Sequence, residues 1–244
     1  MPEITAQVGP SLQGLTREFE VIANNLANVS TSGYKRKFND FSKSLAAFGA
    51  KAAKPNQNDL HLRTSHDFSQ GSFIETGRSL DMALCGNGFF VIETPQGPLY
   101  TRNGAFRIDP NGHLVDLAGR TVAGDSGPLT VPSAVDPSQI AVAADGSISA
   151  AGVSIGKFKL VDFQDQQDKL VSAGLNCFQS PPGTDPIPAG NLVVKQGFQE
   201  GSNVQMVEEL VDMIMVSRLY EANMKFITKN SEASKSLMDV AMGG

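Results

Sequence analysis

The 244-residue sequence contains no tryptophan, only two cysteines and few charged residues. Cys85 and Cys177 are too few for a disulfide-stabilised scaffold, and their spacing does not match a metal-binding pattern. Charged residues make up 18% of the chain, against about a quarter in an average soluble protein. The net charge of −5 gives no overall attraction to nucleic acid or to anionic lipid. Because 41% of the residues are hydrophobic, the composition also excludes an intrinsically disordered chain.

Long hydrophobic runs are absent as well. The most apolar stretch, residues 210–216, contains Asp212 and is far shorter than the ~20 residues of a membrane span. Charged residues at Glu3, Arg17, Glu18 and Glu20 interrupt the start of the chain, so we expect no cleaved secretory signal peptide. Taken alone, these absences favour a cytoplasmic protein.

Apolar residues with a regular spacing predict a helix near the N-terminus. They recur at alternating intervals of four and three residues, the pattern of a coiled-coil seam. We call them the N-terminal seam: Val8, Leu12, Leu15, Phe19, Ile22, Leu26 and Val29. Turn-forming residues at 31–33 end the pattern. An amphipathic helix packed on its own domain is the alternative, but an isolated helix is marginal in water and needs a partner.

A second helix is predicted at the C-terminal end, where Ser202 and Gln205 have the spacing of a capping box. Its apolar residues form two adjacent stripes, a width that suits more than one neighbour. The first stripe is Val204, Val207, Val211 and Ile214, and the second is Leu210, Met213, Tyr220, Met224 and Ile227.

Short strand-like segments occupy the middle of the chain. Residues 106–108 and 113–115 flank Asp109-Pro110-Asn111-Gly112, which predicts a β-hairpin, and 140–142 with 147–148 predict another around Asp145-Gly146. The predicted fold is mainly β with helical arms, in which a compact all-β domain is inserted between N- and C-terminal helices that pair as a coiled coil. The expected parts are an arm at 1–33, a linker at 34–79, a β-rich domain at 80–200 and an arm at 201–244.

Three segments of the chain stand out as motifs. Residues 24–35 read NNLANVSTSGYK, residues 80–83 and 86–90 read LDMA and GNGFF, and the C-terminal segment contains GSNV, EELVDMI and RLYEAN. Together they resemble the bacterial flagellar basal-body rod and hook proteins over nearly the whole chain. The length and the short β domain are similar to a rod subunit rather than to the longer hook protein. Ser217-Arg218 resembles the proximal rod protein, with the distal rod paralogue as the alternative.

The resemblance implies a structural subunit and not an enzyme. Such proteins are exported by the flagellar type III apparatus without a cleaved signal, and they polymerise helically with other rod proteins into the drive shaft that crosses the periplasm. The resemblance therefore predicts a location in the flagellar basal body and not in the cytoplasm. It implies an assembly interface formed by the N-terminal seam, by the two C-terminal stripes apart from Met213, and by Asn24, Asn25 and Asn28. It implies no cofactor, metal, nucleic acid, small-molecule substrate or membrane insertion.

A few short patterns suggest chemistry instead. The tetrapeptide Gly124-Asp125-Ser126-Gly127 occurs in serine proteases, but catalysis also needs a positioned base. None of the candidate bases His61, His66 and His113 has a protease-like context, so we expect a polar turn. His61 and His66 are five residues apart, which suits a solvated linker better than a metal site. Lys35-Arg36-Lys37 is expected to be a solvated run. A serine hydrolase and a β-rich adaptor module remain the alternatives to a rod subunit.

Overall fold

A computed structural model describes residues 2–39 and 64–242, with the side chains of residues 11–39 and 64–233. The described chain divides into two compact units. The helical unit contains residues 2–27, 37–39, 64–65 and 205–242, and the β unit contains residues 28–36 and 66–204. This division differs from the four sequence segments expected above, because residues 28–36 and 66–79 belong to the β unit.

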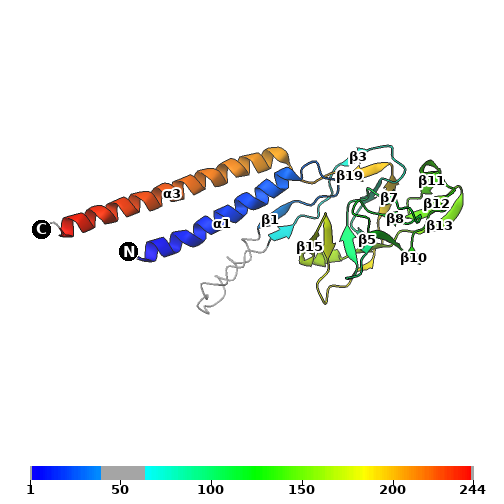
Figure 1. The fold of residues 1–244 in the computed structure, drawn as a ribbon, viewed down its shortest axis with the longest axis horizontal. Coiled ribbons are helices and arrows are strands. Elements are labelled where there is room, and N and C mark those ends of the chain that lie inside the picture. The colour runs from blue at the N-terminus through cyan, green and yellow to red at the C-terminus, as the bar shows by residue number, and fades with distance from the viewer. Residues whose placement is uncertain (1, 40–63, 243–244) are drawn as a thin grey trace. The chain divides into compact units, whose positions relative to one another are not determined.

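Two long helices form most of the helical unit. Helix α1 (Pro2–Ala27) lies beside helix α3 (Met206–Met242), and the two run antiparallel (Figure 1). Strand β1 (Lys37–Asn39) pairs with β2 (Thr64–His66) in a two-stranded sheet. The mainly β chain with a helix at each end confirms the coarse part of the predicted fold class, and the coiled-coil pairing of the two helices stays a prediction.

The helix ends differ from the sequence prediction at two positions. Helix α1 ends at Ala27, where the Thr31 amide donates to the Asn28 carbonyl and turns the chain, so Val29 lies beyond the helix. Helix α3 begins at Met206, with the Glu209 amide donating to the Gln205 carbonyl. The predicted capping box at Ser202 is wrong, because the Ser202 hydroxyl instead accepts from the amide of Val204, which precedes the helix.

The β unit is built on a ten-stranded sheet. Its strands are β5 (Phe89–Glu93), β6 (Leu99–Thr101), β7 (Arg107–Ile108), β8 (Leu114–Val115), β9 (Thr121–Gly124), β10 (Gly127–Pro128), β14 (Leu160–Asp162), β15 (Val171–Gly174), β16 (Cys177–Gln179) and β17 (Ile187–Pro188). Seven of them follow the order β15-β16-β6-β5-β9-β8-β7, while β10 pairs with β9 and β14 joins β5 to β17.

Three smaller sheets complete this unit. They are a three-stranded sheet of β11 (Ile140–Val142), β12 (Ser147–Ala150) and β13 (Val153–Lys157), a pair of β4 (Met82–Cys85) and β18 (Val193–Gln196), and a pair of β3 (Phe73–Glu75) and β19 (Phe198–Glu200). Two short 3-10 segments occur at Pro137–Gln139 and Gln164–Lys169. Both predicted hairpins are confirmed, since β7 pairs with β8 and β11 pairs with β12, each antiparallel.

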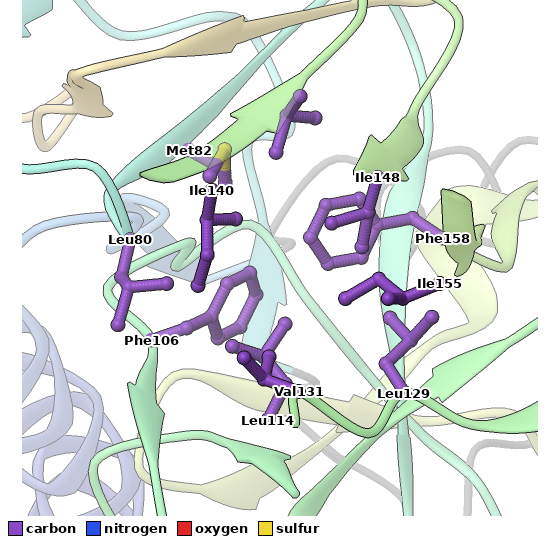
Figure 2. A pocket seen from close by; sticks show the side chains of 11 residues that line it. Leu80, Met82, Phe106, Leu114, Leu129, Val131, Ile140, Ile148, Ile155 and Phe158 are labelled. Carbon is purple, nitrogen blue, oxygen red and sulfur yellow. The ribbon is translucent and has the colours of Figure 1, made fainter. Parts of the chain in front are cut away.

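Strand β5 explains where the core lies. Its first four side chains are all buried, and because successive side chains of a strand point to opposite faces, they enter two different clusters. Phe90 and Ile92 join the larger cluster with Phe106 and Phe158, whereas Phe89 and Val91 join a smaller one. Figure 2 shows apolar side chains of the larger cluster converging on a cavity of about 10 Å³. A space that small holds a single water at most and is a packing gap.

Candidate assembly site

The N-terminal seam is only partly covered within the helical unit. Ile22 is buried at 2% exposure, and Leu12, Leu15 and Leu26 are half-buried. Phe19 is 43% exposed. The side chain of Val8 lies outside the described residues. Thus α1 turns one apolar face inward but leaves a large aromatic ring of that face in contact with solvent.

The face of α3 that is covered within the chain contains only part of the predicted apolar stripes. The less exposed residues recur every three or four positions and define a single helix face. They are Glu209, Asp212, Met213, Val216, Asn223, Ile227 and Asn230. Two carboxylates and two amides therefore share this face with three apolar side chains.

The first predicted stripe of α3 is exposed in the single chain. Val207, Val211 and Ile214 have 74%, 50% and 60% of their surface exposed, on the side of the helix opposite the covered face. We call these three residues the α3 outer stripe. Val204, the fourth predicted member, precedes the helix and is buried in the β unit.

Of the second predicted stripe, Leu210, Tyr220 and Met224 are exposed and Ile227 is half-buried. Exposed apolar surface of this extent on one helix is unusual for a chain that acts alone.

A groove lies between the two helices. Leu15, Thr16 and Phe19 of α1 line it together with Val216, Ser217 and Tyr220 of α3. Its volume is about 280 Å³. Phe19 and Tyr220 are both more than 40% exposed, so the aromatic side chains that border the groove are accessible from solvent.

Asn25 connects the elements of the helical unit. The side chain is fully buried, its Nδ2 donates to the Lys37 carbonyl at 2.8 Å and to Glu209 Oε2 at 3.1 Å, and its Oδ1 accepts from the Lys37 amide at 2.9 Å. One amide therefore holds the end of α1, the start of β1 and the first turn of α3. A leucine at position 25 would remove the Nδ2 donor from the buried Glu209 carboxylate, and a buried carboxylate that loses a hydrogen bond is destabilising. This requirement explains why a polar residue occupies the buried face of α1 near its end.

Asn24 is exposed and Asn28 is half-buried. Thr31 Oγ1 donates to Asn28 Oδ1 in the turn that follows α1. The three asparagines expected at the assembly interface thus have different surroundings, and Asn25 has an internal structural role.

A cluster of three buried charges organises the β unit. Lys35 Nζ donates to Glu200 Oε1 at 2.7 Å and to the Ser69 carbonyl at 2.7 Å, and Arg102 Nη1 lies 3.4 Å from Glu200 Oε2. All three side chains are 1% exposed or less. Burial lowers the pKa of Lys35, and the carboxylate of Glu200 opposes that shift. The expectation of a solvated basic run at Lys35 is wrong, because Glu200 and a backbone carbonyl compensate its burial.

Residues 28–36 are held in the β unit by two further contacts. The amide of Arg36 donates to Asn203 Oδ1 at 2.7 Å, and Asn203 Nδ2 donates to the Asp67 carbonyl at 2.8 Å. The amide of Gly33 donates to the Glu200 carbonyl at 2.7 Å. The end of the N-terminal motif and the residue that follows it therefore contact the segment around the GSNV motif, although the two are far apart in the sequence.

Sequence reasoning did not select Lys35, Arg102, Glu200 or Asn203 as functional residues. Lys35 lies in the motif at residues 24–35 and Asn203 lies in the GSNV motif, and these positions are the only indication of a role that the sequence contains. Glu200 stands directly before the GSNV motif, and nothing in its local pattern distinguishes it from a surface glutamate.

The patterns that suggested chemistry have structural roles. Residues 124–127 form the turn between β9 and β10, with Gly124 opposite Gly127, as expected. His113 Nδ1 lies 3.2 Å from Thr130 Oγ1, and His61 lies outside the described residues. His66 contacts the rings of Phe68 and Phe178 and is half-buried, so the expectation of a solvated linker there is wrong. Within the described chain, no group of His, Cys, Asp or Glu residues is arranged to hold a metal ion.

The two cysteines are free thiols in different environments. Cys177 is 1% exposed and accepts a hydrogen bond from Arg120 Nη2 at 3.0 Å, and burial raises the pKa of its thiol. Cys85 is half-buried. Because the thiolate is the reacting species, we expect iodoacetamide at pH 8 to alkylate Cys85 about tenfold faster than Cys177 in the native protein. Peptide mass mapping over time measures both rates. Equal rates in the native protein would contradict this prediction.

No helix among the described residues combines the length and apolar character needed to cross a bilayer. Family models match three parts of the chain. "Flagella basal body rod protein" covers residues 12–35, "Flagellar hook protein FlgE/F/G D1 domain" covers 83–150, and "Flagellar basal body rod FlgEFG protein C-terminal" covers 195–240.

Curated relatives match over most of their length. The flagellar basal-body rod protein FlgF of Caulobacter vibrioides is 32% identical over 232 residues, 92% of both chains. FlgG of Buchnera aphidicola is 34% identical over 243 residues, 89% of this chain and 91% of that one. FlgF of Salmonella typhimurium is 32% identical over 249 residues, 94% of both chains. Relatives of either name are thus equally similar.

In sequence, the β unit is inserted between two long helices, and α3 leaves an apolar stripe in solvent, which is unusual for a chain that acts alone. Identity above 30% over nine-tenths of both chains assigns this chain to the flagellar basal-body rod protein family. It is a structural protein of the flagellar basal body and not an enzyme.

Proposed function

We propose that this subunit polymerises helically through α1 and α3 and so forms part of the axial shaft of the rod. The α3 outer stripe carries this proposal, because three large aliphatic side chains on one helix face are at least half exposed in the single chain. Fully burying such a side chain contributes about 1.5–3 kcal/mol, so the stripe supplies about 3–6 kcal/mol to a contact with a neighbour.

The contacts that build such a shaft are heterologous. A surface on one copy meets a different surface on the next, and a contact that does not close into a ring extends as a helix. Paired α1 and α3 helices from successive copies would form an inner layer with coiled-coil packing, for which the three- and four-residue spacing of the N-terminal seam is suited. The β unit would form the outer layer and contact neighbouring subunits.

The proposal extends to the export of the subunit and to its position in the rod. The chain would leave the cytoplasm through the flagellar type III export apparatus without a cleaved signal, and the rod would cross the periplasm and transmit torque to the hook. Among rod subunits we propose the proximal position, on the Ser217-Arg218 pair before Leu219.

Replacing Ile214 with aspartate tests the proposal. Ile214 is 60% exposed, so the substitution should leave the folding of the chain unchanged to within about 0.5 kcal/mol. A carboxylate at a buried contact has no partner there, so incorporation into basal bodies and swimming should be lost. Immunoblots of isolated basal bodies and soft-agar motility measure the two outcomes in a deletion strain complemented with the variant.

The matched control is Val153→Asp, which also replaces an exposed aliphatic side chain with aspartate, at a residue 67% exposed in strand β13 of the β unit. We expect this variant to be incorporated normally. Normal swimming of the Ile214→Asp strain, with the variant present in its basal bodies, would refute assembly through this helix face.

A further inference from the structure

The segment that follows α1 and the segment that precedes α3 are hydrogen-bonded to each other inside the β unit. They are residues 28–36 and residues 199–204. The three hydrogen bonds between them run from Ser32 Oγ to Gln199 Oε1 at 2.5 Å, from the Gly33 amide to the Glu200 carbonyl at 2.7 Å and from the Arg36 amide to Asn203 Oδ1 at 2.7 Å. The two segments are therefore fixed to one another, although most of the sequence separates them.

Asn203 also binds a third segment. Its Nδ2 donates to the Asp67 carbonyl at 2.8 Å, to the Ser69 carbonyl at 3.2 Å and to Ser69 Oγ at 3.0 Å. These two residues directly follow β2, where the chain passes from the helical unit into the β unit. One amide side chain thus holds all three chain segments through which the described chain passes between the two units.

The contacts between these segments affect how often the two helices meet. Residues 28–205 separate α1 from α3 in the sequence. The ends of a flexible loop meet less often as the loop lengthens, with a dependence close to the −3/2 power of its length. The bond between Gly33 and Glu200 leaves only residues 28–33 and 200–205 between the helices, which raises the effective concentration of α3 at α1 by about 50-fold over a free loop of full length. Because isolated helices are marginal in water, α1 and α3 depend on this proximity.

We propose that Asn203 is a positioning residue for assembly. Through its bond to the Arg36 amide it keeps the start of α3 close to the end of α1, so that α1 covers one face of α3 and leaves the α3 outer stripe exposed. This inference rests on the proposed polymerisation, because the pairing of the helices within one chain decides which face of α3 remains available to a neighbour.

Two alanine variants separate this role from the stability of the β unit. Asn203→Ala removes the bonds described above. The matched control is Gln196→Ala, which removes another half-buried amide with bonds to the main chain. Gln196 Nε2 donates to the carbonyls of Ser79 and Ile140 at 2.8 and 2.7 Å, and its Oε1 accepts from the Val142 amide at 3.0 Å. None of these partners adjoins the helical unit in the sequence, so we expect both variants to lower the urea midpoint of the β unit by similar amounts.

Hydrogen exchange of the full chain in solution provides the first measurement. In Asn203→Ala, the amides of residues 16–25 of α1 should exchange about tenfold faster than in the wild type, because the two helices are brought together less often. In Gln196→Ala the same amides should exchange within about twofold of the wild-type rate. A lower stability of the β unit acts equally in both variants, so equal rates in α1 would overturn the positioning role.

Incorporation into basal bodies provides the second measurement, by immunoblot in a deletion strain complemented with each variant. We expect about tenfold less Asn203→Ala than wild type, and Gln196→Ala within about twofold of wild type. Asn203→Asp keeps the acceptor for the Arg36 amide but loses the donor to Asp67 and Ser69. This variant should be incorporated more than Asn203→Ala. An equal loss in the two Asn203 variants would assign the effect to the other bonds and overturn the role of the Arg36 contact.

The outcomes distinguish this inference from the proposed function. If Ile214→Asp is incorporated normally, polymerisation through α3 fails, whereas faster exchange of α1 in Asn203→Ala alone still supports the coupling of the helices to Asn203. If Ile214→Asp blocks incorporation while Asn203→Ala and Gln196→Ala are incorporated equally, polymerisation through α3 stands and the positioning role of Asn203 is refuted.

Discussion

Replacing Glu200 with glutamine is expected to lower the free energy of unfolding of the β unit by about 3–5 kcal/mol. Glutamine keeps the size of the side chain but removes its charge. The ammonium of Lys35 and the guanidinium of Arg102 would then remain buried without the carboxylate that both contact. Urea denaturation, followed by the fluorescence of the tyrosines or by circular dichroism, measures the change.

Two comparison variants isolate the charge effect. Glu75→Gln makes the same chemical change at an exposed position of strand β3 and should change stability by less than about 0.5 kcal/mol. Lys35→Met removes one of the two cations and leaves Glu200 and Arg102 as a balanced pair, so it should cost less than Glu200→Gln. If Lys35→Met and Glu200→Gln lower the free energy of unfolding equally, the net charge of the cluster does not determine its stability.

Lys35 also makes stability depend on pH. Its pKa in the folded protein lies below the ordinary 10.5, so between those two values the unfolded chain binds more protons than the folded one. The contribution of Lys35 to the free energy of unfolding therefore increases as the pH rises through that interval. The free energy of unfolding of the wild type, relative to that of Lys35→Met, should therefore increase between neutral pH and about pH 10. A difference that stays constant with pH would contradict a lowered pKa of Lys35.

Replacing Gly33 with alanine is expected to lower the free energy of unfolding by more than about 2 kcal/mol. Gly33 has a φ of +69°, which costs an L-residue about 1–2 kcal/mol. A Cβ there would also lie 2.5 Å from the Asn103 amide nitrogen and 2.8 Å from the Arg102 carbonyl carbon. These are backbone atoms, so residues 31–35 would have to move away from residues 102–103, which would weaken the contacts of Lys35.

Gly77 offers a control for the conformational part of that cost. Its φ is +70°, and a Cβ at this position would have no atom within 4 Å. Gly77→Ala should therefore lose only the left-handed cost, about 1 kcal/mol, and the difference between the two variants measures the packing of Gly33. Hydrogen exchange should in addition become faster at residues 33–36 in Gly33→Ala alone, and equal losses of stability would contradict the close packing.

Regular spacing in the sequence correctly predicts both terminal helices and both hairpins. Asp109-Pro110-Asn111-Gly112 is a local turn signal, and local chemistry is enough to predict the β7–β8 hairpin. The same reasoning extends α1 to Val29, because an apolar residue at the right interval does not reveal the turn that the Thr31 amide closes. Positions near helix ends depend on hydrogen bonds that the hydrophobic pattern does not encode.

The sequence alone determined the order of helix, β region and helix, the apolar positions of each helix, and through its three motifs the family. The tertiary structure decided which of those positions are free to bind. Val207, Val211 and Ile214 satisfy the same helical spacing as buried residues, and only the position of α1 shows that they remain in solvent. It also decided the surroundings of Lys35, whose charge in the sequence suggests exposure. Glu200 lies 165 residues away along the chain, and a contact over that separation depends on the folded backbone and not on any local pattern.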